Sequence, residues 1–91
     1  MFVVVVYDIS HDRRRTKLHN ALLNYGTPVQ YSVFECILDG ERLEKMKAAV
    51  MRVIKPRQDR VRFYYLCQNC LARTEITSGP EVLHETEVIV V

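Results

Sequence analysis

The feature that most constrains this fold is a run of β-branched and aromatic residues at the start of the chain. Residues 2–7 read Phe-Val-Val-Val-Val-Tyr. The run is too short for a buried helix, and its composition favours a strand that is apolar on both faces. A sheet built around such a strand must be covered on both sides, because either face left in water would expose apolar surface.

Two amphipathic segments predict helices that cover one of those faces. In residues 13–25, apolar side chains recur at i, i+3, i+4 and i+7, and Gly26 ends the helix. Residues 41–55 carry a second apolar stripe, which stops before Pro56. Both segments follow polar turns, as helices in globular proteins commonly do.

Strand-like segments fill much of the remaining chain. Residues 30–38 and 60–66 are rich in β-branched and aromatic side chains, 75–77 form a candidate short strand, and 87–91 form an apolar tail. The predicted order is β-α-β-α-β-β, which differs at its centre from the β-α-β-β-α-β order of the ferredoxin-like unit. Either order gives an α+β sandwich with two helices on one face of an antiparallel sheet. The 91 residues leave room for one domain, 1–91.

Two helices cannot cover both faces of a sheet about four strands wide. A second copy of the same sheet would cover the other face, so the sequence predicts a homodimer that associates through the sheet. The apolar residues 88–91 are expected to pair with an exposed strand edge, either of this chain or, by exchange, of the partner.

Composition narrows the class of protein. Apolar residues make up 48% and charged residues 26% of the chain, a balance that excludes disorder, collagen-like repeats and coiled coil. No run approaches the roughly 18 apolar residues of a membrane span, and residues 1–9 lack the basic leader of a signal peptide. With an odd count of three cysteines, these features predict a cytoplasmic protein with no membrane partner.

Charge is distributed unevenly along the chain. Residues 11–20 carry four basic side chains against Asp12, residues 52–62 carry five against Asp59, and residues 63–91 are net acidic. Two basic clusters and an acidic tail predict a polarised surface that binds a polyanion. A solvated charged face is the alternative.

Asp8 is the candidate catalytic and metal-binding residue. It follows the first strand, where a buried scaffold can hold a carboxylate towards a metal or a substrate. One carboxylate is a poor Mg²⁺ site, but two copies of Asp8 across a dimer axis would supply a pair that binds Mg²⁺, activates water and supports phosphodiester hydrolysis. The alternative is a turn residue that accepts backbone hydrogen bonds.

The candidate nucleic-acid-binding residues open the first predicted helix. Cations at a helix amino end oppose the macrodipole, and phosphate contact would compensate for that; plain solubility is the alternative. Tyr7 and Phe34 are supporting candidates, since aromatic rings stack on bases, although core packing also explains them. The basic set is Arg13, Arg14, Arg15 and Lys17.

Cys67 and Cys70 form a single CxxC motif. A structural zinc site needs four ligands, a set that Cys36 and a histidine would have to complete. A thioredoxin-type site would place the motif at the start of a helix after a strand, and no strong helical pattern follows Cys70. Family variation, or a role as a small apolar filler, is the remaining interpretation.

Taken together and in order, these segments resemble the CRISPR-associated Cas-two (Cas2) family. The resemblance rests on Tyr-Asp-Ile-Ser at 7–10, the arginine-rich helix start, and two later segments. These are Val-Gln-Tyr-Ser-Val-Phe-Glu-Cys at 29–36 and Asp-Arg-Val-Arg-Phe-Tyr-Tyr-Leu-Cys at 59–67. The resemblance covers essentially the whole chain. The departures from the family pattern are Pro28, where arginine is common, His11, where an acidic residue is frequent, and Tyr65, where proline is frequent.

The resemblance implies a ferredoxin-like homodimer that acts in CRISPR spacer acquisition. In that role the dimer bridges copies of the Cas-one (Cas1) integrase and holds the incoming DNA. Some members are reported as metal-dependent endonucleases on RNA or DNA. Carried over by position, the family's metal-binding aspartate is Asp8, its basic helix residues are Arg15 and Lys17, and its second-strand phenylalanine is Phe34.

Three functions stay open at this point. The first is an Mg²⁺-dependent endonuclease built on Asp8. The second is a non-catalytic scaffold that grips DNA with its basic clusters while the integrase performs the chemistry. The third is a toxin-like ribonuclease of the VapD type, which shares the fold.

Overall fold

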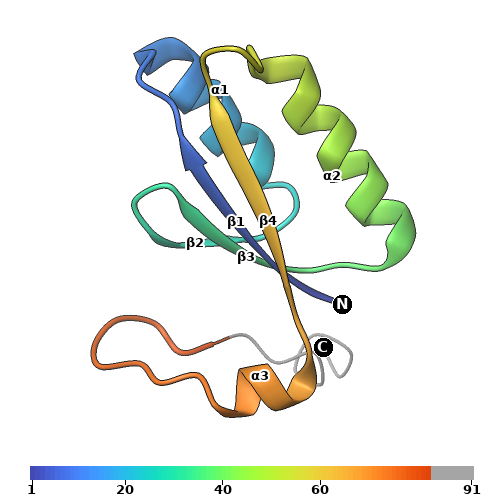
Figure 1. Ribbon diagram of the computed structural model, residues 1–91, viewed down its shortest axis with the longest axis vertical. Helices are drawn as coiled ribbons and strands as arrows, with labels where there is room; N and C mark the ends of the chain where they lie inside the picture. Colours follow the sequence, from blue (N-terminus) through green and yellow to red (C-terminus); the bar gives the residue numbers. More distant parts are fainter. Residues whose placement is uncertain (83–91) are drawn as a thin grey trace.

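The strands form a sheet, and the long helices pack on one face of it to build a two-layer sandwich (Figure 1). A computed structural model describes residues 1–82. The elements are β1 (Phe2–Asp8), α1 (Asp12–Leu22), β2 (Thr27–Gln30), β3 (Val33–Ile37), α2 (Gly40–Val53), β4 (Arg60–Leu66) and α3 (Gln68–Ala72). The four strands form one antiparallel sheet in the order β2-β3-β1-β4. This arrangement confirms the predicted α+β, ferredoxin-like fold.

The predicted single strand over 30–38 is wrong, because it is split into a hairpin. Tyr31 and Ser32 form a turn between β2 and β3, and Ser32 adopts a left-handed backbone conformation with φ 62°. The sequence signal for a two-residue hairpin turn is usually Asn-Gly or a similar pair, whereas this turn has Tyr-Ser. The split changes the predicted β-α-β-α-β-β order into the full β-α-β-β-α-β order.

Three smaller expectations also differ from the structure. Residues 75–77, predicted as a strand, form no regular element, whereas α3 was not predicted at all. The helix predicted over 13–25 ends three residues earlier, at Leu22. The expected pairing of 88–91 lies outside the described residues. None of the helices within residues 1–82 is long and apolar enough to cross a membrane.

The hydrophobic core lies between the sheet and the helices. Alternate residues of β1 point towards it, so that Val3, Val5 and Tyr7 are buried beside Phe34 and Cys36 of β3. The two helices complete it with Leu18, Leu22, Leu43, Met46 and Val50. The chain that leaves α1 passes so close to β3 that a Cβ on Gly26 would lie 2.4 Å from Cys36 Sγ, which explains the glycine there.

The sheet face away from α1 and α2, hereafter the open face, is also largely apolar. The strand registers align Phe2, Val4 and Val6 of β1 with residues of both neighbouring strands. Those partners are Ile37, Glu35 and Val33 of β3, and Leu66, Tyr64 and Arg62 of β4. Residues 74–82 line a groove of about 270 Å³ together with residues of β2 and β3. The chain therefore covers part of the β2–β3 side of this face with its own residues.

Candidate nucleic-acid interface

The start of α1 carries four basic residues, and the structure gives them different surroundings. His11 precedes the helix, and its Nδ1 accepts a hydrogen bond from the Arg14 backbone N–H at 3.2 Å. Arg13 and Lys17 are exposed and lie four residues apart, so they share one outward helical face. These two side chains are the ones placed to reach a ligand directly.

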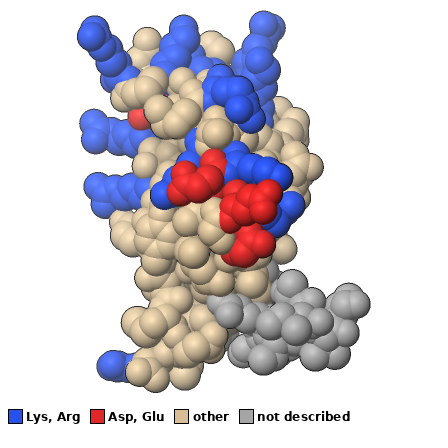
Figure 2. Space-filling view, turned by 90° about the vertical axis from the view of Figure 1, so that its right-hand side faces the viewer, with Lys and Arg blue, Asp and Glu red and all other residues tan. Residues whose placement is uncertain are grey.

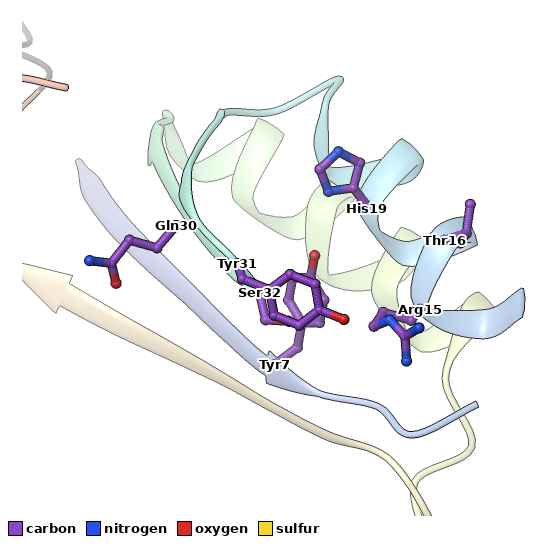
Figure 3. Close-up of a pocket in the computed structure, with 7 residues that line it drawn as sticks. All are labelled: Tyr7, Arg15, Thr16, His19, Gln30, Tyr31 and Ser32. Atoms are coloured by element: carbon purple, nitrogen blue, oxygen red, sulfur yellow. The ribbon is translucent and has the colours of Figure 1, made fainter. Parts of the chain in front are cut away.

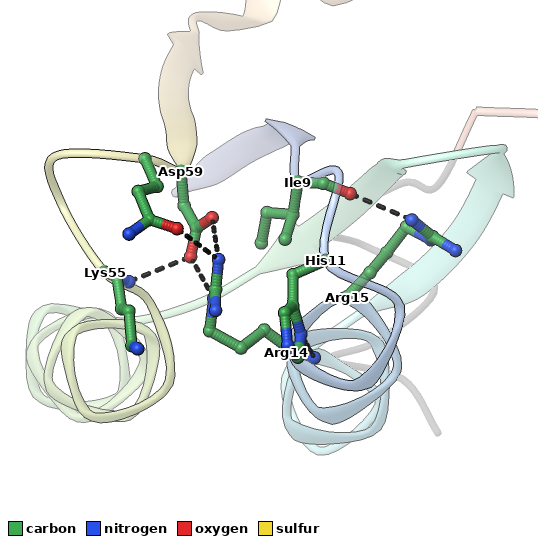
Figure 4. Close-up of polar contacts among 7 residues, drawn as sticks. Ile9, His11, Arg14, Arg15, Lys55 and Asp59 are labelled. Carbon is green, nitrogen blue, oxygen red and sulfur yellow. Dashed lines mark hydrogen bonds and ion pairs between the residues drawn. The ribbon is translucent and has the colours of Figure 1, made fainter.

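Arg14 instead points into the protein and forms an ion pair with Asp59 (Figure 4). Its Nε donates to Asp59 Oδ2 at 2.8 Å and its Nη2 donates to Oδ1 at 3.0 Å, a two-point arrangement that fixes both partners. The Asp59 side chain is only 1% exposed, and its Oδ2 also accepts the Lys55 backbone N–H at 2.8 Å. The Arg14 guanidinium is thus engaged within the fold.

The electrostatics of Asp59 follow from these contacts. The hydrogen bonds from Arg14 lower the pKa of the Asp59 carboxyl, and the Lys55 backbone N–H acts in the same direction, against the effect of burial. The same pairing raises the pKa of Arg14. A charged carboxylate therefore ties the first turn of α1 to the loop between α2 and β4.

This tie brings the two basic clusters of the sequence to one end of the molecule. The loop that holds Asp59 also carries Lys55 and Arg57, and β4 begins beside it at Arg60. Figure 2 shows Lys and Arg side chains gathered over the upper part of the protein, with most acidic side chains in that view lying below them. We call this region the basic end; its exposed cations are Arg13, Lys17, Arg52, Lys55, Arg57 and Arg60.

The sequence pattern indicated only the α1 members of this set as site residues. It showed the second cluster as a run of positive charge, but it had no signal that the two clusters meet. The contact that joins them is the ion pair between Arg14 and Asp59, and a local sequence pattern does not reveal a pair that is 45 residues apart. The partners of the ion pair become clear only once the sheet and helices are in place.

Asp8 lies beside the basic end, on the open face of the sheet. It is exposed, ends β1, and is the cross-strand partner of Arg60. Within residues 1–82, no three His, Cys, Asp or Glu side chains come together in a group that could hold a metal ion. A single Asp8 beside an arginine does not supply the oxygen ligands that Mg²⁺ needs, so this part of one chain does not fit that ion.

Arg15 and Tyr7 line a cavity of about 230 Å³ between α1 and the β2–β3 turn (Figure 3). Arg15 Nη1 donates to the Ile9 carbonyl at 2.9 Å and Nη2 donates to Asp12, which raises the pKa of Arg15. Burial raises the pKa of the Tyr7 hydroxyl. The other lining residues are Thr16, His19, Gln30, Tyr31 and Ser32.

Phe34 supports this cavity from within the core. Its ring is fully buried, and the His19 ring meets it edge-on with 5.1 Å between ring centroids. Base stacking on Phe34 would need that ring to leave the core, so its packing role is the one that the structure shows. Tyr31, which also lines the cavity, is 80% exposed, so its ring is accessible to solvent and ligands.

The predicted site residues therefore do not form one cluster. Arg13 and Lys17 face solvent, Arg14 is tied to Asp59, and Tyr7 and Asp8 point to opposite sides of the sheet because they are neighbours on one strand. What the structure assembles best is an exposed basic surface carried by α1, the end of α2, the loop between α2 and β4, and the start of β4.

Comparisons with known proteins bear on this arrangement. A family model described as CRISPR associated protein Cas2 matches residues 1–74. A protein of Chloroflexus aurantiacus with the name CRISPR-associated endoribonuclease Cas2 3 is 45% identical over 76 residues, which cover 84% of this chain and 82% of the relative.

Solved structures show the same similarity. The crystal structure of Streptococcus pyogenes Cas2 superimposes with a TM-score of 0.76 at 30% identity, and the match covers 86% of this chain and 100% of that one. A chain of a partial Cas6-RT-Cas1–Cas2 complex superimposes with a TM-score of 0.77 at 26% identity, covering 91% of both chains. The similarity therefore extends through the basic end and all four strands.

Proposed function

The chain belongs to the CRISPR-associated Cas2 family, and from this premise we propose that it acts in CRISPR adaptation as a homodimer that holds DNA for a Cas1 integrase. The similarity to a chain of a Cas1–Cas2 complex supports the partner. The joining of two basic clusters into one exposed surface is the observation that carries the DNA-holding role. Family membership favours adaptation over the toxin-like ribonuclease of the VapD type.

Within this proposal, the basic end binds DNA through its phosphates. Arg13 and Lys17 extend from a helix, and Arg57 and Arg60 extend from the loop and strand that Asp59 anchors. Cations held on such elements fix the position of a duplex without reading its bases. Arg14 has a positioning role, since it holds the two halves of the surface together.

The open face supports the homodimer. Four apolar residues of this face are only half-buried in the single chain: Val4, Val6, Val33 and Ile37. A second copy of the sheet would remove their remaining apolar surface from water and so stabilise the dimer. Two copies would also bring together two basic ends, which would lengthen the surface available to a duplex.

Salt dependence tests the DNA-holding role. If about four Lys or Arg side chains per dimer contact phosphates, the logarithm of the affinity for duplex DNA should fall with the logarithm of salt concentration at a slope of roughly −3.6. Fluorescence anisotropy with a labelled duplex measures that slope. The matched control is Lys45→Ala, which removes an exposed cation paired with Glu41 at 3.3 Å on α2 and should leave the slope unchanged. A flat response in the wild type would contradict the proposal.

A second candidate function is Mg²⁺-dependent hydrolysis of phosphodiester bonds by Asp8. It is favoured by the exposure of Asp8 beside Arg60 and by the endoribonuclease name of the Chloroflexus relative. Since a single Asp8 is too few ligands for Mg²⁺, the activity would require Asp8 from both copies of a dimer. The test compares wild type with Asp8→Asn on single-stranded RNA and duplex DNA, with and without Mg²⁺. Cleavage that persists in Asp8→Asn would contradict this function.

A further inference from the structure

The CxxC motif lies at the end of the molecule away from the basic end, and neither function above uses it. β4 ends at Leu66, Cys67 is the N-cap of α3, and the helix begins at Gln68. The motif therefore does occupy the start of a helix after a strand, although sequence reasoning saw no strong helix there. Both cysteines are exposed, which removes the interpretation that they fill apolar space.

The two sulfur atoms are positioned to react with each other. Cys67 Sγ and Cys70 Sγ lie 3.5 Å apart. A disulfide needs a separation of about 2.0 Å, which rotation of two exposed side chains can supply. The third cysteine, Cys36, is buried and contacts Met46 Sδ at 3.8 Å. Residues 1–82 hold no group of three or more ligands that would complete a zinc site around the pair.

The local environment makes the two thiols unequal. Hydrogen bonds from the backbone N–H and the side chain of Cys70 lower the pKa of Cys67. The neighbouring Cys67 sulfur raises the pKa of Cys70. Because the thiolate is the nucleophile, Cys67 is suited to attack and Cys70 to resolve the product. Burial raises the pKa of Cys36 to about 11, so it is nearly inert at neutral pH.

We propose that Cys67 and Cys70 form a dithiol–disulfide couple that exchanges with low-molecular-weight disulfides. The Cys67 thiolate attacks one sulfur of the small disulfide, whose S–S bond breaks and releases one thiolate that takes up a proton. The Cys70 thiol then loses its proton and attacks Cys67 Sγ, and the second small thiol leaves. The protein dithiol is oxidised by two electrons, and one small disulfide is reduced to two thiols.

The couple is placed to act on the segment that follows it. The backbone N–H of Leu71 donates to the Cys67 carbonyl at 3.0 Å, and Thr74 Oγ1 donates to the Cys70 carbonyl at 3.0 Å. Residues 74–82 then run along the groove beside β2 and β3. A disulfide across the first turn of α3 would restrict the backbone from which this segment leaves, and so reduce its opening.

Equilibration of the full chain with defined mixtures of reduced and oxidised glutathione tests the couple. After an acid quench, alkylation and mass spectrometry should show that the Cys67 and Cys70 thiols disappear together, with the removal of two hydrogen atoms and no added glutathione. Cys36 should remain a free thiol and become alkylated only after denaturation, which makes it the internal control. Amide hydrogen exchange across 74–82 should be slower in the oxidised protein.

Two single variants separate the roles of the cysteines. Cys70→Ser should trap glutathione on Cys67, because the Cys70 backbone N–H that activates this thiol is kept. Cys67→Ser has no such activated thiol and should react more slowly. Both positions are exposed, so thermal unfolding should match that of the wild type. The proposal is overturned if folded protein forms no Cys67–Cys70 disulfide in fully oxidised glutathione, or if the two variants react equally fast. Stoichiometric zinc that Cys67→Ser releases would also overturn it, in favour of a metal site. If oxidation leaves amide hydrogen exchange across 74–82 unchanged, the proposed effect of the disulfide on that segment is overturned.

Discussion

The two ends of the β1–β4 strand pair differ in what they present to solvent. At one end, Asp8 stands opposite Arg60, next to the basic side chains that the Arg14–Asp59 pair gathers. At the other, Phe2 stands opposite Leu66, and the chain continues into an exposed pair of cysteines. The same antiparallel ladder thus separates a charged end from a sulfur-bearing end. Under the two proposals above, nucleic-acid contact and thiol chemistry would use separate surfaces of the protein.

Removing the charge of the basic end should have the largest effect. Each phosphate contact makes the affinity at 0.1 M salt roughly eight times what it would be without that contact, taking 1 M salt as the reference. If these residues supply the roughly four phosphate contacts per dimer proposed above, a variant with Arg13, Lys17, Arg57 and Arg60 all changed to alanine should bind duplex DNA about four-thousandfold more weakly. Anisotropy titration at fixed salt measures the decrease, and circular dichroism checks that the variant folds. Wild-type affinity in the folded variant would place DNA elsewhere on the protein.

Disrupting the Arg14–Asp59 ion pair should have the next largest effect. Asp59→Ala leaves Arg14 without its carboxylate and the Lys55 N–H without its acceptor. Removal of one partner of a buried pair is strongly destabilising, so the melting temperature should fall by about 10 °C. Asp12→Ala, at an exposed aspartate paired with Arg15, is the matched control and should shift the melting temperature far less. Equal shifts would argue against a special role for Asp59.

The same ion pair predicts a dependence of stability on pH. Because the folded protein lowers the pKa of Asp59, its contribution is fully present above the ordinary aspartate pKa of about 3.9 and is lost as the pH falls through the lower folded pKa. The difference in melting temperature between wild type and Asp59→Asn should therefore be constant from about pH 5 to 7 and shrink below about pH 4. Calorimetric scans across that range measure it, and a difference that grows towards low pH would contradict the assignment.

The sulfur-bearing end should contribute least to DNA binding. The double variant Cys67→Ser/Cys70→Ser lies at the opposite end of β4 from Arg60, so its affinity for duplex DNA should stay within about twofold of wild type. A larger decrease, measured in the same anisotropy titration, would show that the two ends do not act separately.

Local pattern was sufficient to predict most of the fold. β1, both long helices and β4 lie close to their expected positions because their apolar periodicity matches one element type throughout. The β2–β3 hairpin was missed because its turn uses Tyr31 and Ser32, and the need for a left-handed Ser32 is not visible in the residue types. The five-residue α3 is too short to show a period.

The site was less predictable because its key relations are long-range. Arg13, Arg14, Arg15 and Lys17 look alike in the sequence, but only the position of Asp59 distinguishes Arg14 from its neighbours. Likewise, the strand register alone places Arg60 opposite Asp8. Residue types suggested the phosphate chemistry, whereas tertiary pairing decided which cations hold the fold and which remain available.

The most direct test of the central claim, that two sequence clusters form one DNA surface, is the salt slope of two paired variants. Arg13→Ala/Lys17→Ala removes the α1 half, and Arg57→Ala/Arg60→Ala removes the loop half. If both halves bind phosphates, each variant should flatten the dependence of duplex affinity on salt relative to wild type, by about 0.9 for each phosphate that it no longer neutralises. A loop variant whose slope equals that of wild type would show that the second cluster lies outside the interface, and it would contradict the account.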